Sequence, residues 1–138
     1  MSKENDIDIM ARTLWAEARG EGDLGIRAVA CVIMNRFREK KWYSFLNGTH
    51  TIAGVCQKPA QFSCWNKSDP NRSKLLTINE SDLIFRECMI IAETAMDGKL
   101  EDITFGANHY FASWISKPKW ADKMQFCITI GQHNFYKE

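Results

Sequence analysis

A predicted helix that is apolar on nearly every side constrains this fold more than any other feature. It runs from about Asp23 to Arg38, and one face carries Ile26, Val29, Ala30, Ile33, Met34 and Phe37. The opposite face is apolar as well, through Ala28, Cys31 and Val32. A helix of this kind belongs in the centre of a domain, with other elements packed around it. Asn35 is then a buried amide, which we expect to tie a loop to the helix by hydrogen bonds.

The helix predicted before it ends beside a carboxylate, Glu17. Its apolar stripe recurs at helical spacing, through Ile7, Met10, Ala11, Leu14 and Ala18. Glu17 falls at the edge of this stripe, Arg12 and Arg19 project on the far side, and Gly20 and Gly22 end the helix. We therefore expect Glu17 to be half-buried, with no cation on its own face. Burial raises the pKa of a carboxyl group, so Glu17 is either a general acid or an ordinary glutamate at a helix boundary.

Composition limits the class of protein. The 138 residues suit a single domain, 1–138, and a net charge of +1 argues against nucleic-acid binding, which needs clustered Lys and Arg. No apolar run is long enough to span a bilayer, and the N-terminal residues lack signal-peptide character. We expect synthesis in the cytoplasm without an export signal. The five cysteines are odd in number and irregularly spaced, which favours a reducing compartment over a disulfide framework or a zinc site.

The rest of the chain divides into an irregular region, a helix and a small sheet. Residues 42–79 lack periodicity, apart from one short helix around Ile52–Gln57. Thr77–Glu80 reads as a capping box for a long helix that ends at Gly98, with a stripe of Ile84, Cys88, Ile91, Ala92 and Ala95. Strands are expected at 109–111 and on both sides of a hairpin turn at Ile130–Gln132. The predicted fold is α+β, mainly helical, with a small antiparallel sheet from the C-terminal third.

Three kinds of chemistry fit the residue types. Cleavage of a glycosidic bond needs a protonated carboxyl, here Glu17, and a groove of aromatic and amide side chains, for which the chain offers Gln61, Phe62, Trp65, Asn66, Asn108, Tyr110 and Trp114. Cysteine nucleophilic chemistry would use Cys56 or Cys64 activated by His109. Metal-dependent hydrolysis would need ligands among His50, His109 and His133, which have no partner at ligand spacing, so neither metal nor cofactor is expected.

Ordered blocks of sequence then resemble the SleB/CwlJ-type cell-wall hydrolases. Residues 16–36, AEARGEGDLGIRAVACVIMNR, look like that family's GEARGE-like element followed by a helix that ends in V-I-x-N-R. Residues 51–55 and 59–63 are similar to its T-I-x-x-V and P-x-Q-F-S segments. Residues 107–111, 118–120 and 130–136 match its A-x-H-Y, P-x-W and I-G-x-H-x-F-Y blocks. The blocks keep their order over roughly residues 8 to 137.

This resemblance implies a lysozyme-like domain that degrades peptidoglycan glycan strands, usually as a lytic transglycosylase. The family's catalytic glutamate falls on Glu17, where Ala16 replaces the usual preceding Gly. One glutamate would then act as acid and base, giving 1,6-anhydromuramoyl ends. Groove residues implied by the matching blocks are Gln61, Phe62 and Ser63, with His109 and Tyr110 lining the same cleft. Trp65 and Asn108 complete the expected substrate-binding set, and Tyr110 is a candidate to steady a departing sugar oxygen.

Several alternatives stay open at this point. A hydrolytic muramidase would need a second carboxylate, for which Glu21 and Asp23 are the candidates, although a hydrogen-bond acceptor in a loop is the preferred interpretation of Glu21. A cysteine peptidase or amidase would cut peptide stems, and a murein-binding module would cut nothing. Some blocks look more like phage or prophage members of the family, which would need a holin, a spanin-type partner or delivery in the virion to reach the wall. A monomer is expected.

Overall fold

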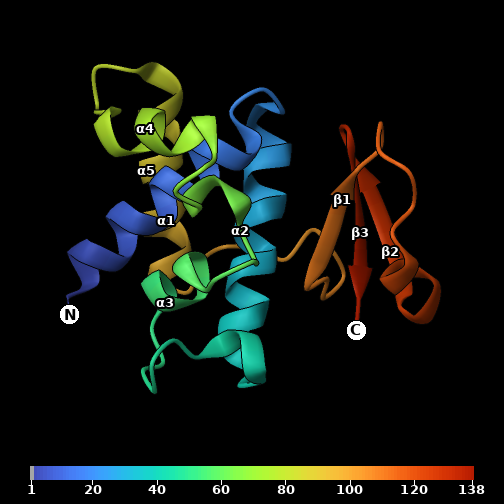
Figure 1. Ribbon diagram of the computed structural model, residues 1–138. Coiled ribbons are helices and arrows are strands. Elements are labelled where there is room, and N and C mark those ends of the chain that lie inside the picture. The colour runs from blue at the N-terminus through green and yellow to red at the C-terminus, as the bar shows by residue number, and fades with distance from the viewer. Residues whose placement is uncertain (1) are drawn as a thin grey trace.

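In the computed structural model, which describes residues 2–138, a helical part and a three-stranded sheet lie on opposite sides of one central helix (Figure 1). The α-helices are α1 (Lys3–Ala18), α2 (Gly22–Glu39), α3 (Ile52–Gln57), α4 (Pro70–Thr77) and α5 (Leu83–Met96). Single turns of 3-10 helix are η1 (Trp42–Ser44), η2 (Ser63–Trp65) and η3 (Lys119–Lys123). The strands are β1 (His109–Ala112), β2 (Gln125–Ile130) and β3 (His133–Lys137).

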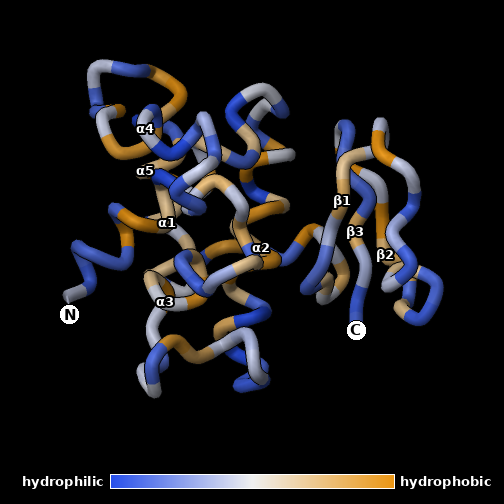
Figure 2. The backbone as a smooth tube through the Cα atoms, in the orientation of Figure 1, coloured by the Kyte–Doolittle hydropathy of each residue, from blue (hydrophilic) through white to orange (hydrophobic). Residues whose placement is uncertain are grey.

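The central helix is α2, as its apolar surface predicts. One side, with Ile26, Val29 and Ile33, joins the main core formed with α1, α3 and α5. The other side, with Ala28 and Val32, packs against Ala107 and Phe135 beneath the sheet. In Figure 2 the tube of α2 is hydrophobic along much of its length, with the helical part on one side and the sheet on the other. The helix needs apolar residues all round because it serves two cores.

The sheet is antiparallel with the order β1-β3-β2, so the last strand in the chain lies in the middle. Tyr110 pairs with Phe135, and Ile130 pairs with His133 across the turn. Gly131 occupies that turn with φ 57°, a left-handed conformation that favours glycine. The expected hairpin, the strand at 109–111 and the α+β class are therefore confirmed.

The predicted capping box at Thr77–Glu80 is wrong. Thr77 ends α4, and the next helix begins at Leu83, where the Asp82 side chain accepts from the Phe85 backbone N–H at 2.9 Å. This later start buries Phe85 and leaves Ile84 39% exposed, so Ile84 is not part of the core stripe. The helix ends at Met96, and Gly98 follows with φ 74°, as expected of a glycine at a helix end.

Helix α4 lies within the stretch expected to be irregular. Its N-cap is Asp69, whose side chain accepts from Asn71, and Pro70 occupies the first turn, where the lack of an N–H costs nothing. Its only buried residue is Leu75, so its polar composition hid the helical periodicity. The short helix at Ile52–Gln57 is confirmed, capped by the Thr51 hydroxyl. None of the helices in residues 2–138 combines the length and the apolar character needed to cross a membrane.

Candidate active site

Glu17 lies in the last turn of α1 and points toward the sheet. Its side chain is half-buried, as predicted, and Oε1 accepts a hydrogen bond from the hydroxyl of Tyr110 on β1. This contact joins residues 93 positions apart, from the helical part and from the sheet. Glu17 is therefore held at the boundary between the two parts of the molecule.

The surroundings of Glu17 act on its pKa in opposite directions. Burial raises the pKa most strongly, and the hydrogen bonds from Tyr110 and Cys64 lower it. Asp69 raises it further, whereas the guanidinium of Arg36 lowers it. The net result is a pKa above the ordinary value for glutamate, which suits a group that must hold a proton before it reacts.

As expected, α1 places no cation on the Glu17 face among the described residues 2–138. Arg12 donates to the carbonyls of Leu75 and Ile78 instead, and Arg19 reaches Asn71 at 3.0 Å. The sequence did not reveal that α2 supplies one. Arg36, from the far half of α2, acts on Glu17 through space, so the carboxylate form of Glu17 is not left without compensation.

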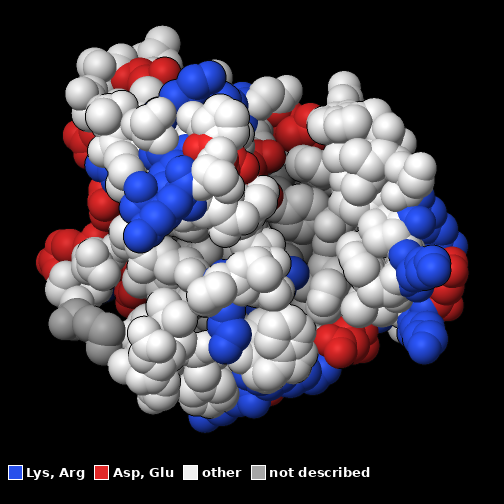
Figure 3. All heavy atoms as spheres, viewed as in Figure 1, with Lys and Arg blue, Asp and Glu red and all other residues white. Residues whose placement is uncertain are grey.

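A pocket of about 440 Å³ opens beside Tyr110, between the helical part and the sheet. In the space-filling view the surface is hollowed along this boundary (Figure 3). Its lining combines three aromatic rings with polar groups: Arg36, Trp42, Ala60, Gln61, His109, Tyr110, Trp120, Met124 and Glu138. A mixture of ring faces and a few polar atoms is typical of a site for a polar organic ligand such as a sugar.

Arg36 forms the base of this pocket although it is a buried cation, only 5% exposed. Its Nε donates to the backbone oxygen of Asn108 at 2.6 Å, and Nη1 donates to Oε1 of Gln61 at 3.3 Å. The guanidinium also lies over the rings of Tyr43 and Phe62, at 5.5 and 5.1 Å from their centroids. Burial lowers the pKa of Arg36, and within residues 2–138 no carboxylate lies at ion-pair distance from it.

The predicted groove residues of the 61–65 segment take different positions. Gln61 lines the pocket and is held by Arg36. Phe62 is only 2% exposed and packs beneath Arg36, so its role as a substrate contact is not supported by its position. Ser63 is exposed at the start of η2. Trp65 packs on the main core and donates from Nε1 to the Thr13 hydroxyl at 3.0 Å, which fixes its ring.

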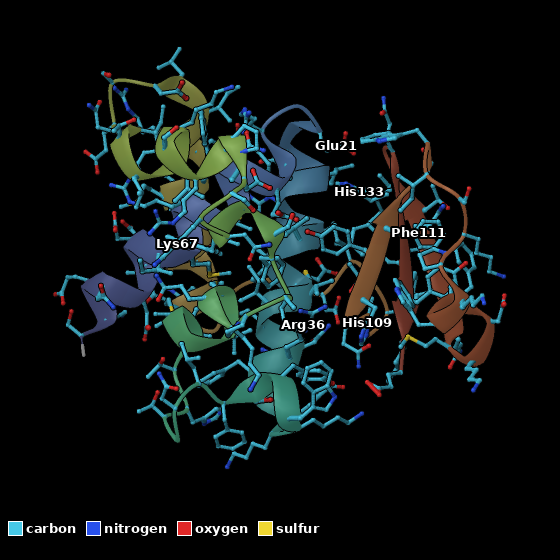
Figure 4. All side chains as sticks on the ribbon, viewed as in Figure 1. Glu21, Arg36, Lys67, His109, Phe111 and His133 are labelled. Carbon is cyan, nitrogen blue, oxygen red and sulfur yellow. The ribbon has the colours of Figure 1, made fainter. Side chains whose placement is uncertain are left out.

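The residues of the 108–110 segment also take different positions: the first is buried, and the other two line the pocket. Asn108 is completely buried, and Nδ2 donates to Glu39 and to Tyr43, so the expectation that it binds substrate is corrected: it joins β1 to the end of α2. His109 lines the pocket, with Nδ1 2.8 Å from Oδ1 of Asn108. Burial and then the charge of Arg36 lower the pKa of His109 to about 4, so its ring is neutral near neutral pH. Arg36 and His109 lie close together at the lower end of the boundary in Figure 4.

Glu21 does not join Glu17 in a carboxylate pair. It occupies the N-cap position of α2 without capping it, and its Oε1 accepts from the backbone N–H of Gln132 at 2.9 Å. The same oxygen lies 3.6 Å from Nδ1 of His133. Figure 4 shows Glu21 and His133 facing each other across the upper end of the boundary. The preferred interpretation, a hydrogen-bond acceptor in a loop, agrees with this position.

Five residues that matter to the site were missed by sequence reasoning: Arg36, Trp42, Trp120, Met124 and His133 as a neighbour of Tyr110. Arg36 carried a detectable signal, since it is a cation on a helix otherwise expected to be buried. Trp120 and His133 also stand in the 118–120 and 130–136 blocks, which could have marked them. Trp42 and Met124 come from segments without periodicity, so nothing in the sequence pointed to them.

The rival chemistries find little support in the geometry. Cys56 and Cys64 are buried, and burial raises their pKa, that of Cys56 to about 12, which opposes formation of a thiolate nucleophile. His109 is hydrogen-bonded to Asn108 rather than to a thiol. All five cysteines are free. Across residues 2–138 no three potential ligands among His, Cys, Asp and Glu converge on a point where they could hold a metal ion.

Comparison with known proteins decides the family. A family model described as Cell Wall Hydrolase matches residues 20–136, beginning just after Glu17. The chain belongs to this family. The match includes the 108–111 and 130–136 blocks and every residue that lines the pocket except Glu138, so most of the pocket lies within the part that this cell wall hydrolase shares with the family.

Relatives and solved structures agree with this assignment. A spore cortex-lytic enzyme of Bacillus cereus is 32% identical over 134 residues, which cover 97% of this chain and 45% of the relative. A spore cortex-lytic enzyme of Halalkalibacterium halodurans is 28% identical, covering 96% of this chain and 34% of the relative. This chain therefore spans less than half the length of these relatives.

The solved structures are catalytic domains of similar size. That of the germination-specific lytic transglycosylase SleB from Bacillus anthracis is 32% identical, with a TM-score of 0.72 and coverage of 97% of this chain and 95% of the other. The catalytic domain of Bacillus cereus SleB is 31% identical, with a TM-score of 0.71 and coverage of 97% and 91%. These likenesses confirm the expected lysozyme-like α+β fold.

Proposed function

We propose that this domain cleaves the β-1,4 bond between N-acetylmuramic acid and N-acetylglucosamine in peptidoglycan, as a lytic transglycosylase with Glu17 as its only acid and base. The observation that carries the proposal is the half-buried Glu17, with its raised pKa and its hydrogen bond from Tyr110, beside a pocket of aromatic and polar side chains. The similar Bacillus anthracis domain belongs to a germination-specific lytic transglycosylase, which supports the reaction type.

In the first step Glu17 donates its proton to the glycosidic oxygen. The bond from that oxygen to C1 of the muramoyl residue breaks, and the departing sugar carries the proton as a hydroxyl group. Glu17 is then a carboxylate beside an electron-poor C1. The donors Tyr110 and Cys64 and the charge of Arg36 favour this charged form and so stabilise it between the two steps.

In the second step the Glu17 carboxylate takes the proton of the muramoyl 6-hydroxyl while that oxygen bonds to C1. The products are a 1,6-anhydromuramoyl end and a protonated Glu17, and no water is consumed. One carboxylate is enough for this sequence, whereas a hydrolase of the usual kind needs a second. Asp69 influences Glu17 but is engaged as the N-cap of α4, and Glu21 is engaged by Gln132.

The direct test is digestion of purified peptidoglycan followed by mass analysis of the new ends. Anhydromuramoyl ends are expected, and reducing muramic ends would replace the proposal with a hydrolytic muramidase. New amino termini and sensitivity to thiol alkylation would point to the cysteine peptidase alternative. Binding to sacculi without any release would point to a binding module.

Glu17→Gln is expected to lower turnover by about 10²–10⁴-fold, because the amide cannot donate a proton to the glycosidic oxygen. Glu93→Gln is the matched control, since Glu93 is an exposed glutamate on α5. Full activity of the Glu17→Gln protein, with a folded far-ultraviolet circular dichroism spectrum, would remove Glu17 from the reaction.

A further inference from the structure

Glu21 lies in a space that two glycines keep open. Gly25, one turn into α2, would place an added Cβ 2.3 Å from the Cβ of Glu21, and Gly131 in the β2–β3 turn would place one 2.9 Å from Oε1. Both distances are shorter than real Cβ atoms show, so a larger residue at position 131 would push the carboxylate aside, and one at position 25 would force the backbone of Glu21 itself to shift. The Glu21 side chain is only 11% exposed. A loop acceptor at the surface needs no such enclosure.

The group opposite Glu21 is a buried imidazole with an unused donor position. His133 is 5% exposed, and its Nδ1, 3.6 Å from Oε1 of Glu21, is buried without a hydrogen-bond partner among the described residues. Burial lowers the pKa of His133, while the charge of Glu21 raises it. Nδ1 of His133 therefore faces the carboxylate of Glu21 just beyond hydrogen-bond distance, and a proton carried on Nδ1 would point toward that carboxylate.

His133 in turn supports the tyrosine that contacts Glu17. The ring of Tyr110 lies 5.0 Å from the ring of His133 and 5.5 Å from that of Phe135, measured between centroids. The Tyr110 hydroxyl donates to Glu17. A series of contacts thus runs from Glu21 through His133 and Tyr110 to Glu17, and it crosses from the helical part to the sheet and back. Its first two members, Glu21 and His133, are labelled in Figure 4.

We propose that Glu21 is a positioning residue for Glu17: through His133 it sets the place of the Tyr110 ring, and hence the hydrogen bond that Tyr110 donates to Glu17. This inference rests on the proposed role of Glu17 as acid and base. It gives the second glutamate of the 15–22 segment a function without making it a second catalytic carboxylate. It also accounts for the absence of a side chain on Gly25, whereas Gly131, the other glycine that faces Glu21, is already favoured by its left-handed turn conformation.

The expected consequence is a change in the pH profile. The groups facing Glu17 are Tyr110 from β1, Cys64 from η2, Asp69 at the start of α4 and Arg36 from α2. The Tyr110 hydrogen bond favours the Glu17 carboxylate, so a displaced Tyr110 raises the pKa of Glu17. Activity requires protonated Glu17 and falls as pH rises through that pKa. Loss of Glu21 therefore moves the basic limb of the kcat/KM profile to higher pH.

The variants to compare are Glu21→Gln, Tyr110→Phe and the double variant, with Asp23→Asn as the matched control. Asp23 is a nearby carboxylate that is exposed and paired with Arg27 at 2.8 Å. On soluble glycan strands, Glu21→Gln is expected to lower kcat about tenfold with little change in KM, and to shift the basic limb in the same direction as Tyr110→Phe. In the Tyr110→Phe background, Glu21→Gln is expected to cause no further shift. Asp23→Asn is expected to retain the parent profile.

A second measurement does not depend on activity. Nitrogen-15 NMR of the imidazole rings reports the tautomer and the pKa of His133, and Glu21→Gln is expected to lower that pKa, because the charge that raises it is lost.

The proposal is overturned if the pKa of His133 does not change, if the basic limb of the kcat/KM profile stays in place, or if the shifts of the two single variants add in the double variant. Restoration of Glu21→Gln activity by added formate would also overturn it, since that result marks a carboxylate that takes part in the chemistry. Glu17→Gln separates failure of this proposal from failure of the proposed function. A fully active Glu17→Gln protein would remove Glu17 from the reaction, while the NMR response of His133 to Glu21→Gln would be unaffected.

Discussion

The sheet is attached to the helical part at two ends, and the two attachments are built differently. At the lower end Arg36, Asn108, Glu39 and Tyr43 form a buried network in which the Asn108 side chain alone has several partners. At the upper end Glu21 makes one hydrogen bond of 2.9 Å to Gln132 and a 3.6 Å approach to His133, whose Nδ1 is otherwise unpartnered. The lower end holds the two parts together, whereas the upper end, on our proposal, sets the position of Tyr110 beside Glu17.

The two histidines repeat this difference. His109, at the lower end, faces the cation of Arg36, and burial and that charge both lower its pKa. His133, at the upper end, faces the carboxylate of Glu21, whose charge opposes the effect of burial. Similar rings on neighbouring strands of one sheet thus have opposite electrostatic partners. Three changes, ordered from the largest expected effect to the smallest, test whether the ends are as separate as the structure indicates.

Arg36→Met should have the largest effect, because it removes the cation on which the lower network converges. The backbone oxygen of Asn108 loses a 2.6 Å bond and Gln61 loses its partner, and each unsatisfied buried group costs about 1–3 kcal/mol. We expect the free energy of unfolding in urea to fall by ~3 kcal/mol. Arg27→Met, which breaks an exposed pair with Asp23, should cost less than about 1 kcal/mol. Equal losses in the two variants would contradict a special role for the lower end.

Acidification should act mainly on the lower end through His109. Folding lowers its pKa from the ordinary value of 6.5 to about 4, so between these values the unfolded chain binds the proton more readily. The free energy of unfolding should therefore decrease as pH falls from about 6.5 to about 4, by at most ~3 kcal/mol, with no contribution from His109 above that range. Urea unfolding at pH 7 and pH 4.5 measures the difference. His109→Gln should lose less stability on acidification than the parent protein, and identical losses would rule out His109 as the source.

Gly25→Ala should act mainly on the upper end. Its added Cβ would meet the Cβ of Glu21 at 2.3 Å, and because that Cβ cannot rotate away, the start of α2 must shift and carry the carboxylate away from His133, at a cost of about 1–3 kcal/mol. We expect the basic limb of the kcat/KM profile to move to higher pH, as in Glu21→Gln. Gly20→Ala is the matched control, because nothing lies within 4 Å of an added Cβ there. A similar pH shift in both glycine variants would show that Gly25 does not act through Glu21.

Local sequence signals predicted much of the fold. The central helix was found because its residues are apolar on both sides, and the hairpin because Gly131 stands between two β-branched and aromatic runs. The start of α5 was placed too early, since Thr77 and Asp82 are both good caps and only the packing of Phe85 decides between them. Helix α4 was missed because its single buried residue, Leu75, gives no periodicity.

The half-burial of Glu17 was predictable from its place on the helix, but spacing alone left an ordinary boundary glutamate open. The resemblance pointed to Glu17 as the acid and to Tyr110 as a neighbour in the same cleft. The surroundings that tune them were not predictable, because Arg36 meets Asn108 across 72 positions and Gln132 meets Glu21 across 111. Asn108 shows the reverse error: an amide in a matching block was taken for a substrate contact, whereas it is completely buried.

The strand order has a consequence for how this groove comes into being. Because β3 pairs with both β1 and β2, neither of those strands has a partner until residues 133–137 have left the ribosome. The helices can pack on one another earlier, since their contacts join segments already synthesised. Tyr110 is therefore held against Glu17 only after residues 133–137 have emerged, and the nascent chain carries Glu17 long before it carries the strand that fixes Tyr110 in place.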